Sequence, residues 1–358
     1  MDFDLSPDQI ALEGAARSFL IEQCPTARVR TIHESGSGWD RELWSEMVEL
    51  GWLGVAVPES AGGLGLGLVE LALLAEAAAR HVVPVPFVST VIAIEIARAA
   101  ADHDLVDRLL AGATACVAWC SDRSSLRATG DRLTGRSDPV PFGPTADLAV
   151  VIAATDSSDL GVFAVELTDA VRPAVEPAMD LTRPLGWLEL DDTPARRLGG
   201  TELAQRLTDV GAMTSAMELL GTGSVAMELA VQYAKDRVQF GRPIGSFQAV
   251  KHRCADMLVD VEGIRSSAYW AAWCLSVDDP DRSVAASTAK VWAGDASKRV
   301  MAGALQVHGG IGFTWEHDLH LFMKRAQLDQ LDFGDSPWHR VRLGELLRAK
   351  VVAGERVL

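Results

Sequence analysis

Apolar residues recur at helical spacing on both sides of one turn-rich stretch, residues 237–248, which reads R-V-Q-F-G-R-P-I-G-S-F-Q. Phe240 and Gly241 break the helical pattern, and Pro243 predicts a short turn. Ser246 is the expected N-cap of the second helix. The stretch therefore joins two long helices at a corner. Their apolar faces are formed by Leu219, Thr222, Ala226, Leu229 and Tyr233, and by Val250, Cys254, Met257 and Val261.

The N-terminal part of the chain, residues 1–113, reads as helical. Ser6 and Pro7 have the residue types of a helix start, with the serine as cap and the proline in the first turn. An alanine-rich helix is expected over residues 68–80, and prolines at 84 and 86 stop it. An earlier apolar stripe, which Gly51 ends, is formed by Leu43, Met47 and Leu50.

The pattern changes between residues 114 and 201. Short apolar or alternating runs at 114–119, 148–153, 161–167 and 187–190 are separated by Gly, Asp, Ser and Pro, which predicts strands. Helical periodicity returns over 202–358, where five helices fit between the breaks. We therefore expect an α+β protein: an N-terminal helical domain (1–113), a middle β-barrel or sandwich (114–201) and a C-terminal helical bundle (202–358).

Charge and composition exclude several partners and sites. The net charge of −16 argues against nucleic acid or an anionic membrane as partner, and no apolar run reaches membrane-spanning length. The first residues contain no signal-peptide core, which predicts a cytoplasmic protein. His317 and His320 have no supporting carboxylate or thiol cluster, so we expect no metal site there. Five cysteines without a C-x-x-C pair are predicted to be buried free thiols: Cys24, Cys116, Cys120, Cys254 and Cys274.

The corner at 237–248 carries residue types that could bind a phosphate-bearing ligand. Arg237 offers a rigid fork of donors, Phe240 a flat face, and Gly241 a backbone that a ligand can approach. Taken alone, the stretch is better explained as a helix–helix corner with an incidental arginine. A second motif, Q-V-H-G-G-I-G-F at 306–313, follows another predicted helix at 282–307 and adds to the ligand-binding interpretation.

The order R-x-x-F-G, F-Q and then Q-x-x-G-G-x-G resembles the C-terminal domain of the acyl-CoA dehydrogenase family. The segment at 49–65, E-L-G-W-L-G-V-A-V-P-E-S-A-G-G-L-G, resembles the first domain of that family. The glycines at 62–67 lack a preceding strand and a following acid, so we expect a loop between helices, not a dinucleotide-binding turn. The resemblance implies the helical, β, helical domain order and an FAD cofactor.

The resemblance also implies a catalytic carboxylate, which this chain lacks. Members of the family use a glutamate to remove the α-proton of an acyl-CoA while the β-hydrogen leaves as hydride to FAD, which requires a carboxylate with a raised pKa. The matching position is Phe333, and the alternative position used by some members is Gly211. Neither side chain can accept a proton. The neighbouring acids Asp332, Asp335 and Glu218 lie out of register and are expected to be solvated or capping residues.

The strand motifs with which the family holds the flavin ring are also missing. The matching segments are residues 118–125, A-W-C-S-D-R-S-S, and residues 137–143, S-D-P-V-P-F-G. Proline in the second segment removes a backbone N–H that could bind the flavin. For Trp119 and Phe142, core packing is the expected role.

The residues that survive are those that, by resemblance, contact the adenosine and pyrophosphate half of an FAD bound by a neighbouring subunit. They are Arg237, Phe240, Gln248, Gln306, Gly309 and Gly310.

Three hypotheses follow. The chain is the non-catalytic subunit of a heterotetrameric acyl-CoA dehydrogenase, like actinobacterial members with half the usual FAD count that act on bulky acyl-CoAs such as steroid side chains. It then completes the FAD site of a sister subunit that carries the glutamate and most of the acyl-CoA pocket. Alternatively, it is a homo-oligomeric binding or scaffold protein without redox activity, or an active homotetramer with an unusual base. The surviving Arg237 and Gln306 favour the first hypothesis.

Overall fold

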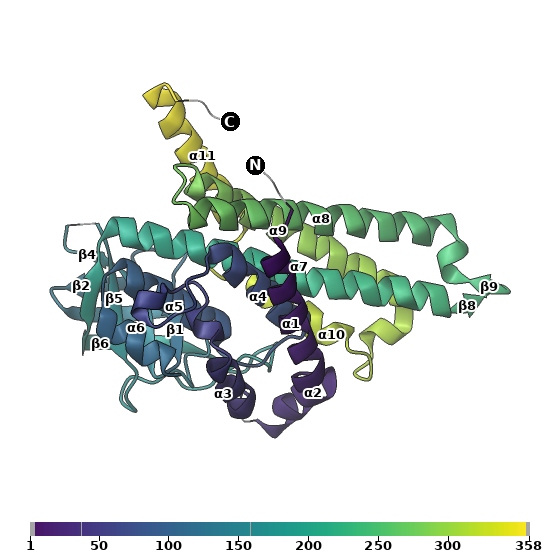
Figure 1. The fold of residues 1–358 in the computed structure, drawn as a ribbon, viewed down its shortest axis with the longest axis horizontal. Helices are drawn as coiled ribbons and strands as arrows, with labels where there is room; N and C mark the ends of the chain where they lie inside the picture. Colours follow the sequence, from purple (N-terminus) through teal and green to yellow (C-terminus); the bar gives the residue numbers. More distant parts are fainter. Residues whose placement is uncertain (1–3, 37, 158, 356–358) are drawn as a thin grey trace. The chain divides into compact units, whose positions relative to one another are not determined.

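The structure is a computed structural model that describes residues 4–36, 38–157 and 159–355 (Figure 1). Its N-terminal part is helical, and two 3₁₀ turns, η1 (Trp52–Gly54) and η2 (Glu59–Ala61), separate the third and fourth helices. The helices are α1 (Pro7–Gln23), α2 (Thr26–Ser35), α3 (Arg41–Glu49), α4 (Leu68–Arg80), α5 (Phe87–Ala99) and α6 (His103–Leu110).

Strands follow, and then helices again, in the order that the sequence predicts. The strands are β1 (Ala115–Ala118), β2 (Leu126–Thr129), β3 (Arg132–Pro141), β4 (Leu148–Thr155), β5 (Leu160–Glu166), β6 (Leu185–Pro194) and β7 (Arg196–Gly199). The C-terminal elements are α7 (Thr201–Asp236), β8 (Val238–Gln239), β9 (Arg242–Pro243), η3 (Ile244–Ser246), α8 (Gln248–Ser276), α9 (Arg282–His308), η4 (Gly309–Phe313), α10 (Leu319–Asp329) and α11 (Ser336–Ala353).

The described residues pack into two compact units. The first comprises those of Met1–Thr26, Ala72–Val83 and Ala212–Leu358, and the second those of Ala27–Leu71 and Pro84–Gly211. The helical, sheet, helical order along the chain is confirmed, whereas the domain boundaries near 113 and 201 stay predictions.

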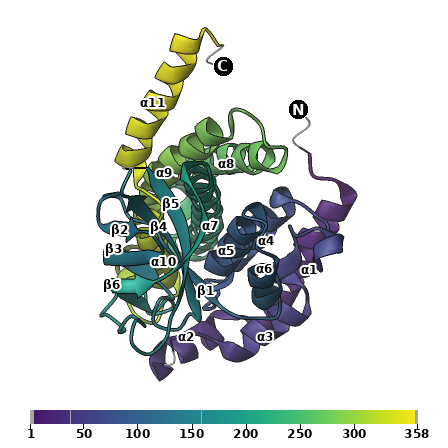
Figure 2. The same cartoon turned by 90° about the vertical axis from the view of Figure 1, so that its left-hand side faces the viewer.

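The second unit contains one mixed sheet of seven strands in the order β6-β3-β2-β4-β5-β7, with β1 also paired to β4. The two strands that pair in parallel with β4 are β1 and β2. Among the described strands, β6 and β7 at the two ends of this order are not paired with each other, so the sheet does not close into a barrel and that alternative is wrong. The reason lies in β4, whose first six residues are buried on both faces and need covering layers instead of closure. Helix α5 packs beside β1 (Figure 2), and the Thr90 hydroxyl of α5 accepts from Ala115 N of β1 at 3.1 Å.

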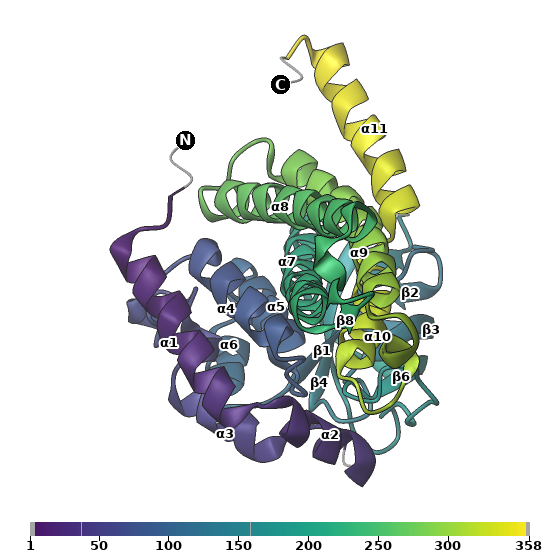
Figure 3. The ribbon, with the colours of Figure 1, turned by 90° about the vertical axis from the view of Figure 1, so that its right-hand side faces the viewer.

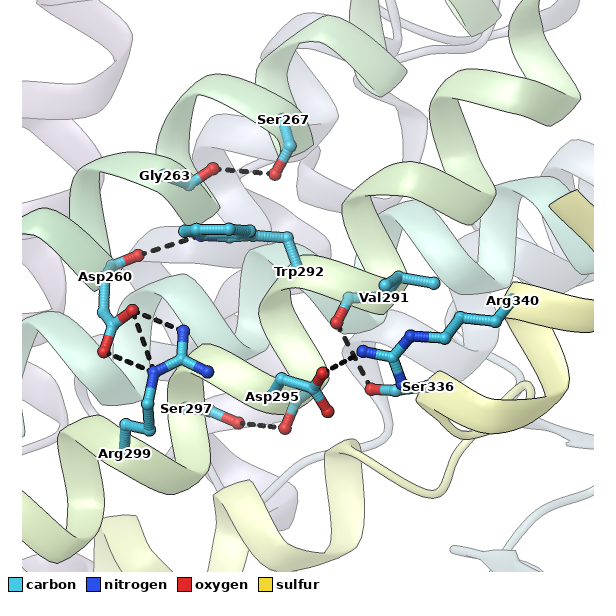
Figure 4. A network of polar contacts seen from close by, with 11 residues as sticks. Asp260, Gly263, Ser267, Val291, Trp292, Asp295, Ser297, Arg299, Ser336 and Arg340 are labelled. Carbon is cyan, nitrogen blue, oxygen red and sulfur yellow. Dashed lines mark hydrogen bonds and ion pairs between the residues drawn. The ribbon is translucent and has the colours of Figure 1, made fainter.

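In the first unit, α8 and α9 form a closely packed pair (Figure 4). A Cβ on Gly263 would lie 2.3 Å from Trp292 Nε1, so only glycine lets the indole lie against α8. Trp292 Nε1 donates to Asp260 O at 3.3 Å, and Arg299 Nε donates to the Asp260 carboxylate at 3.0 Å. Because polar bonds and ring packing act together here, the relative position of the two helices is fixed.

Several local predictions can be checked directly. The cap at Ser6, with Pro7 in the first turn, is confirmed: the backbone N–H of Gln9 donates to Ser6 Oγ at 3.2 Å. Ser246 is not the N-cap of α8: its hydroxyl donates to Pro243 O at 2.7 Å and closes the short turn, and α8 begins two residues later. Leu50 is exposed because α3 ends one residue before it. Cys254 is half-buried, while the other four thiols are buried.

None of the helices in the described ranges combines the length and the apolar content that a bilayer crossing needs.

Candidate functional site

The corner between α7 and α8 is a β-hairpin whose turn residues are Phe240 and Gly241. Gln239 pairs with Arg242 across it, and both turn residues have positive φ, 54° and 77°. A two-residue hairpin turn of this kind favours glycine, so Phe240 adopts a backbone conformation that strains a bulky residue. Its side chain is also 92 % exposed. An aromatic residue that is strained and unburied contributes nothing to this chain's own core, which indicates a contact outside it.

Positively charged side chains gather around this hairpin, in the stretch between Asp236 and Asp256. Residues 237–255 contain four Lys or Arg residues and no Asp or Glu, in a chain with 33 basic and 49 acidic residues. The four are exposed, and none of them forms an ion pair with any residue in the described ranges: Arg237, Arg242, Lys251 and Arg253. The acid-free run is a signal that the sequence already contained. It makes the corner suitable for an anionic ligand.

The aromatic residues of the corner are held in fixed positions. Arg242 lies over the ring of Phe247 at 4.2 Å, and that ring meets Phe240 edge-on at 6.1 Å between centroids. Gln248, the first residue of α8, directly follows this group and is exposed. A Cβ on Gly245 would lie 2.9 Å from Ala234 O, so glycine allows the corner to fold back onto α7.

The glycine turn after α9 presents open backbone. Gly309 ends the helix at φ 62° and ψ −137°, a conformation essentially restricted to glycine. Gly310 lies outside the positive-φ region and is exposed, and a Cβ added there would meet nothing within 4 Å. Gln306 is exposed on the last turn of α9. Nothing inside the described chain therefore requires glycine at 310, whereas a ligand approaching the backbone would.

The structure brings the corner and the glycine turn together through one ring contact. Tyr233, one turn before Arg237, stacks on His308 with centroids 4.9 Å apart, and Arg237 N donates to Tyr233 O at 2.8 Å. His308 directly precedes Gly309. Figure 3 looks onto the end of these helices where β8 lies, with α9 and α10 beside it. Periodicity alone did not identify either ring as part of the site.

Phe333, which the sequence comparison predicts to occupy the family's acid position, lies in the turn between α10 and α11. Phe333 has φ 55° and Gly334 φ 99°, and the His339 ring nitrogen Nε2 lies 2.9 Å from Phe333 O. Asp335 caps α11, where its carboxylate accepts from Trp338 N at 2.9 Å, so the expected capping role is confirmed for this acid. Ser336 Oγ donates to Val291 O at 3.3 Å and ties the start of α11 to α9 (Figure 4).

A buried lysine stands beside this turn. Lys290 is fully buried, and its Nζ donates to Asp329 O and Gln330 O, both at 2.9 Å. Burial lowers the pKa of Lys290 from 10.5 to about 8, against the opposing charges of Asp332, Asp329, Asp335 and Glu218. Glu218 is 5 % exposed, so the prediction that it is a solvated acid is wrong. No group of three or more potential metal ligands is present in the described ranges.

The two strand segments compared with the flavin motifs bond within the chain. Trp119 is buried beneath Arg123, whose guanidinium lies 4.3 Å from the indole, and Trp119 Nε1 donates to Thr208 Oγ1 at 3.1 Å. Ser121 N donates to the Asp138 carboxylate at 2.9 Å. Phe142 is also buried, so core packing is confirmed for both aromatic residues.

The comparisons with known proteins agree with this arrangement. Residues 6–114 match the acyl-CoA dehydrogenase N-terminal domain and residues 199–347 match the acyl-CoA dehydrogenase C-terminal domain. The chain belongs to the acyl-CoA dehydrogenase family, whose members are generally FAD-dependent oxidoreductases.

One relative and two solved structures are similar to this chain over almost its whole length. The chain is 30% identical to the acyl-CoA dehydrogenase FadE27 of Mycobacterium tuberculosis, over 97% of this chain and 99% of that protein. A solved ChsE4-ChsE5 complex from Mycobacterium tuberculosis contains a chain with 30% identity and a TM-score of 0.89, covering 97% of this chain and 99% of that chain. A solved Tcur3481-Tcur3483 steroid ACAD variant gives 31% identity and a TM-score of 0.89, over 96% and 99%.

Proposed function

We propose that this chain is the non-catalytic subunit of a heteromeric acyl-CoA dehydrogenase. In this proposal it binds the adenosine and pyrophosphate half of an FAD whose flavin ring is held by a sister subunit. The sister subunit carries the catalytic glutamate and most of the acyl-CoA pocket. When bound, FAD would supply the hydride acceptor, and the residues of this chain would hold and orient the cofactor. We also propose a cytoplasmic location and a bulky acyl-CoA substrate, as the steroid-related neighbour suggests.

One observation carries the proposal: the corner and the glycine turn expose a basic group, an aromatic ring and open backbone that suit a phosphate-bearing ligand. Arg237 is exposed without an ion pair among the described residues, Phe240 is strained and 92 % exposed, and Gly310 leaves open backbone. A phosphate-bearing, aromatic ligand fits a fork of donors beside a flat ring and an open backbone.

The absence of a base at Phe333 and of free flavin-binding groups in the described strands supports the non-catalytic role. Phe333 occupies the position of the family's base and cannot accept a proton. The strand segments near Trp119 and Asp138 use their polar groups within the chain. Two neighbours are described by paired names, ChsE4-ChsE5 and Tcur3481-Tcur3483, which is consistent with heteromeric assembly of this chain too.

The test is the substitution Arg237→Ala in the assembled complex, purified with its sister subunit. A charge-assisted hydrogen bond to pyrophosphate is worth roughly 1.5–3 kcal/mol, so FAD affinity should fall about tenfold to a hundredfold. Flavin absorbance during titration of the FAD-free complex measures it. Gln306→Ala should act in the same direction but less strongly, because its amide is neutral.

The matched control is Arg348→Ala. Arg348 is an exposed arginine of α11 without an ion pair among the described residues, and it should leave FAD affinity unchanged. The scaffold hypothesis predicts instead that Arg237→Ala is as neutral as the control, since a solvated surface charge contributes little. Unchanged affinity in the Arg237 variant would therefore overturn the proposed function.

A further inference from the structure

His308 is buried between two other rings at the end of α9. Its ring stacks on Tyr233 of α7, with centroids 4.9 Å apart, and meets His317 edge-on at 4.4 Å. Its Nδ1 lies 2.8 Å from Ala304 O and donates to that carbonyl. The side chain is 3 % exposed. The imidazole is therefore fixed by packing on two sides and by one hydrogen bond along its own helix.

The surroundings leave this ring little freedom to move. A Cβ on Gly312 would lie 3.0 Å from His308 Cβ, so η4 turns back closely over the residue. The Tyr233 backbone, in turn, accepts the hydrogen bond from Arg237 N at 2.8 Å. A displacement of either ring would thus be transmitted to the residue that begins the corner or to the glycine that ends α9.

This contact joins the two elements on which the proposed cofactor site depends. Arg237 and Phe240 lie at the end of α7, whereas Gly309 and Gly310 follow α9, about seventy residues later in the chain. A ligand held by both elements at once requires a fixed distance between them. If the turn after α9 is misplaced relative to the corner by a fraction of an ångström, the bonds from both elements to the ligand are weakened.

We propose that His308 is a positioning residue for the cofactor: its stack on Tyr233 sets the Gly309–Gly310 turn relative to Arg237. The ring itself does not touch the ligand. The inference rests on the proposed function, because it assigns the stack to the same FAD half-site. A stacked aromatic pair contributes about 0.5–1.5 kcal/mol beyond its buried area, so its loss should weaken FAD binding roughly twofold to tenfold.

Three substitutions separate the ring from the hydrogen bond, each in the complex with the sister subunit. His308→Phe keeps a ring and loses the donor, His308→Asn keeps a donor for Ala304 O and loses the ring, and His308→Ala loses both. We expect FAD affinity to fall by a similar factor in the Asn and Ala variants and to stay within about twofold of wild type in the Phe variant. Flavin titration measures affinity, and melting temperature is recorded for each complex.

Each outcome has a defined meaning. Equal loss of affinity in the Phe and Ala variants, or retention in the Asn variant, would assign the effect to the hydrogen bond and overturn the inference. A lower melting temperature with unchanged affinity in all three would leave His308 a purely structural residue and overturn it too. Loss of affinity in Arg237→Ala without loss in His308→Ala would contradict the inference alone. A neutral Arg237→Ala would contradict the proposed function itself.

Discussion

The ammonium group of Lys290 donates to the backbone carbonyl of Asp329 at 2.9 Å in the interior of the C-terminal helices. Asp329 is the last residue of α10, so the lysine satisfies a terminal carbonyl with a cation placed at the negative end of the helix dipole. Both side chains are fully buried. The contact fixes the start of the turn that contains Phe333.

Lys290→Met should destabilise the chain in a pH-dependent way. The folded pKa of Lys290 is lowered to about 8 from 10.5, so between these values the unfolded chain binds more protons. Its burial cost is present below pH 8 and is relieved as pH rises, by at most about 1.4 kcal/mol per unit. The stability difference between wild type and Lys290→Met should therefore grow in favour of wild type from pH 8 to 10.

Urea unfolding at pH 7, 8, 9 and 10 measures this difference. Lys251→Met, at an exposed position without an ion pair among the described residues, is the matched control and should show no such slope. At pH 7 the variant leaves the Asp329 and Gln330 carbonyls without the Lys290 donor, which should cost about 1–3 kcal/mol, offset in part by removal of the buried charge. A pH-independent difference would mean that Lys290 titrates as it does in water.

Phe240→Asn should stabilise the isolated chain and weaken the complex. Asparagine tolerates positive φ better than phenylalanine does, so relief of strain at φ 54° should add on the order of 1 kcal/mol to the free energy of unfolding. The lost ring should at the same time lower FAD retention by the complex. Thermal unfolding of the chain and flavin content of the complex give the two values. A parallel fall in both would place Phe240 in this chain's own core.

Gly310→Ala should leave the chain's stability unchanged or slightly raised and should weaken FAD binding. The new Cβ meets nothing within 4 Å inside the chain, and Ala is favoured over Gly in helical backbone. A ligand packed against this backbone would overlap with the methyl group, and 1–3 kcal/mol of overpacking corresponds to about fivefold to a hundredfold in affinity.

Gly344→Ala is the matched control for this prediction. Gly344 lies in α11, is exposed and also has nothing within 4 Å of an added Cβ. This control should raise the melting temperature without changing FAD affinity. If Gly310→Ala behaves like the control in the complex, no ligand approaches the backbone at this turn.

Phe333→Glu should not make the lone chain an active dehydrogenase. The substitution supplies a carboxylate at the position that we propose for the family's base. Trp119 lies beneath Arg123 and Ser121 bonds to Asp138 in the segments that we propose as counterparts of the flavin-binding strands. Loss of cofactor orientation costs several powers of ten in rate. Stopped-flow assays with acyl-CoA and added FAD test the lone variant beside wild type, which should also be inactive. Rapid oxidation of acyl-CoA by either protein would show that this chain alone binds and orients a whole FAD.

The sequence by itself determined the long helices, four of the strands and the residues of the candidate site. Helical periodicity gave α7, α8 and α9 because their buried faces repeat every three to four residues, and short alternating runs located β1, β4, β5 and β6. It also placed Arg237 and Phe240 at a corner and Gly309 and Gly310 after a helix end, since turn residues act locally.

The tertiary structure decided the features that depend on contacts between residues far apart in the chain. Sheet order depends on pairing between distant strands, so a barrel could not be told from the open mixed sheet. Ser246 does not cap α8, because its hydroxyl donates to Pro243 O instead. The sequence pattern does not distinguish Lys290 from a surface lysine of a helix. Its side chain is buried only because α10 and α11 pack against α9. Only tertiary packing brings the rings of Tyr233 and His308 together. The two residues are far apart in the chain and come into contact because α7 and α9 pack side by side.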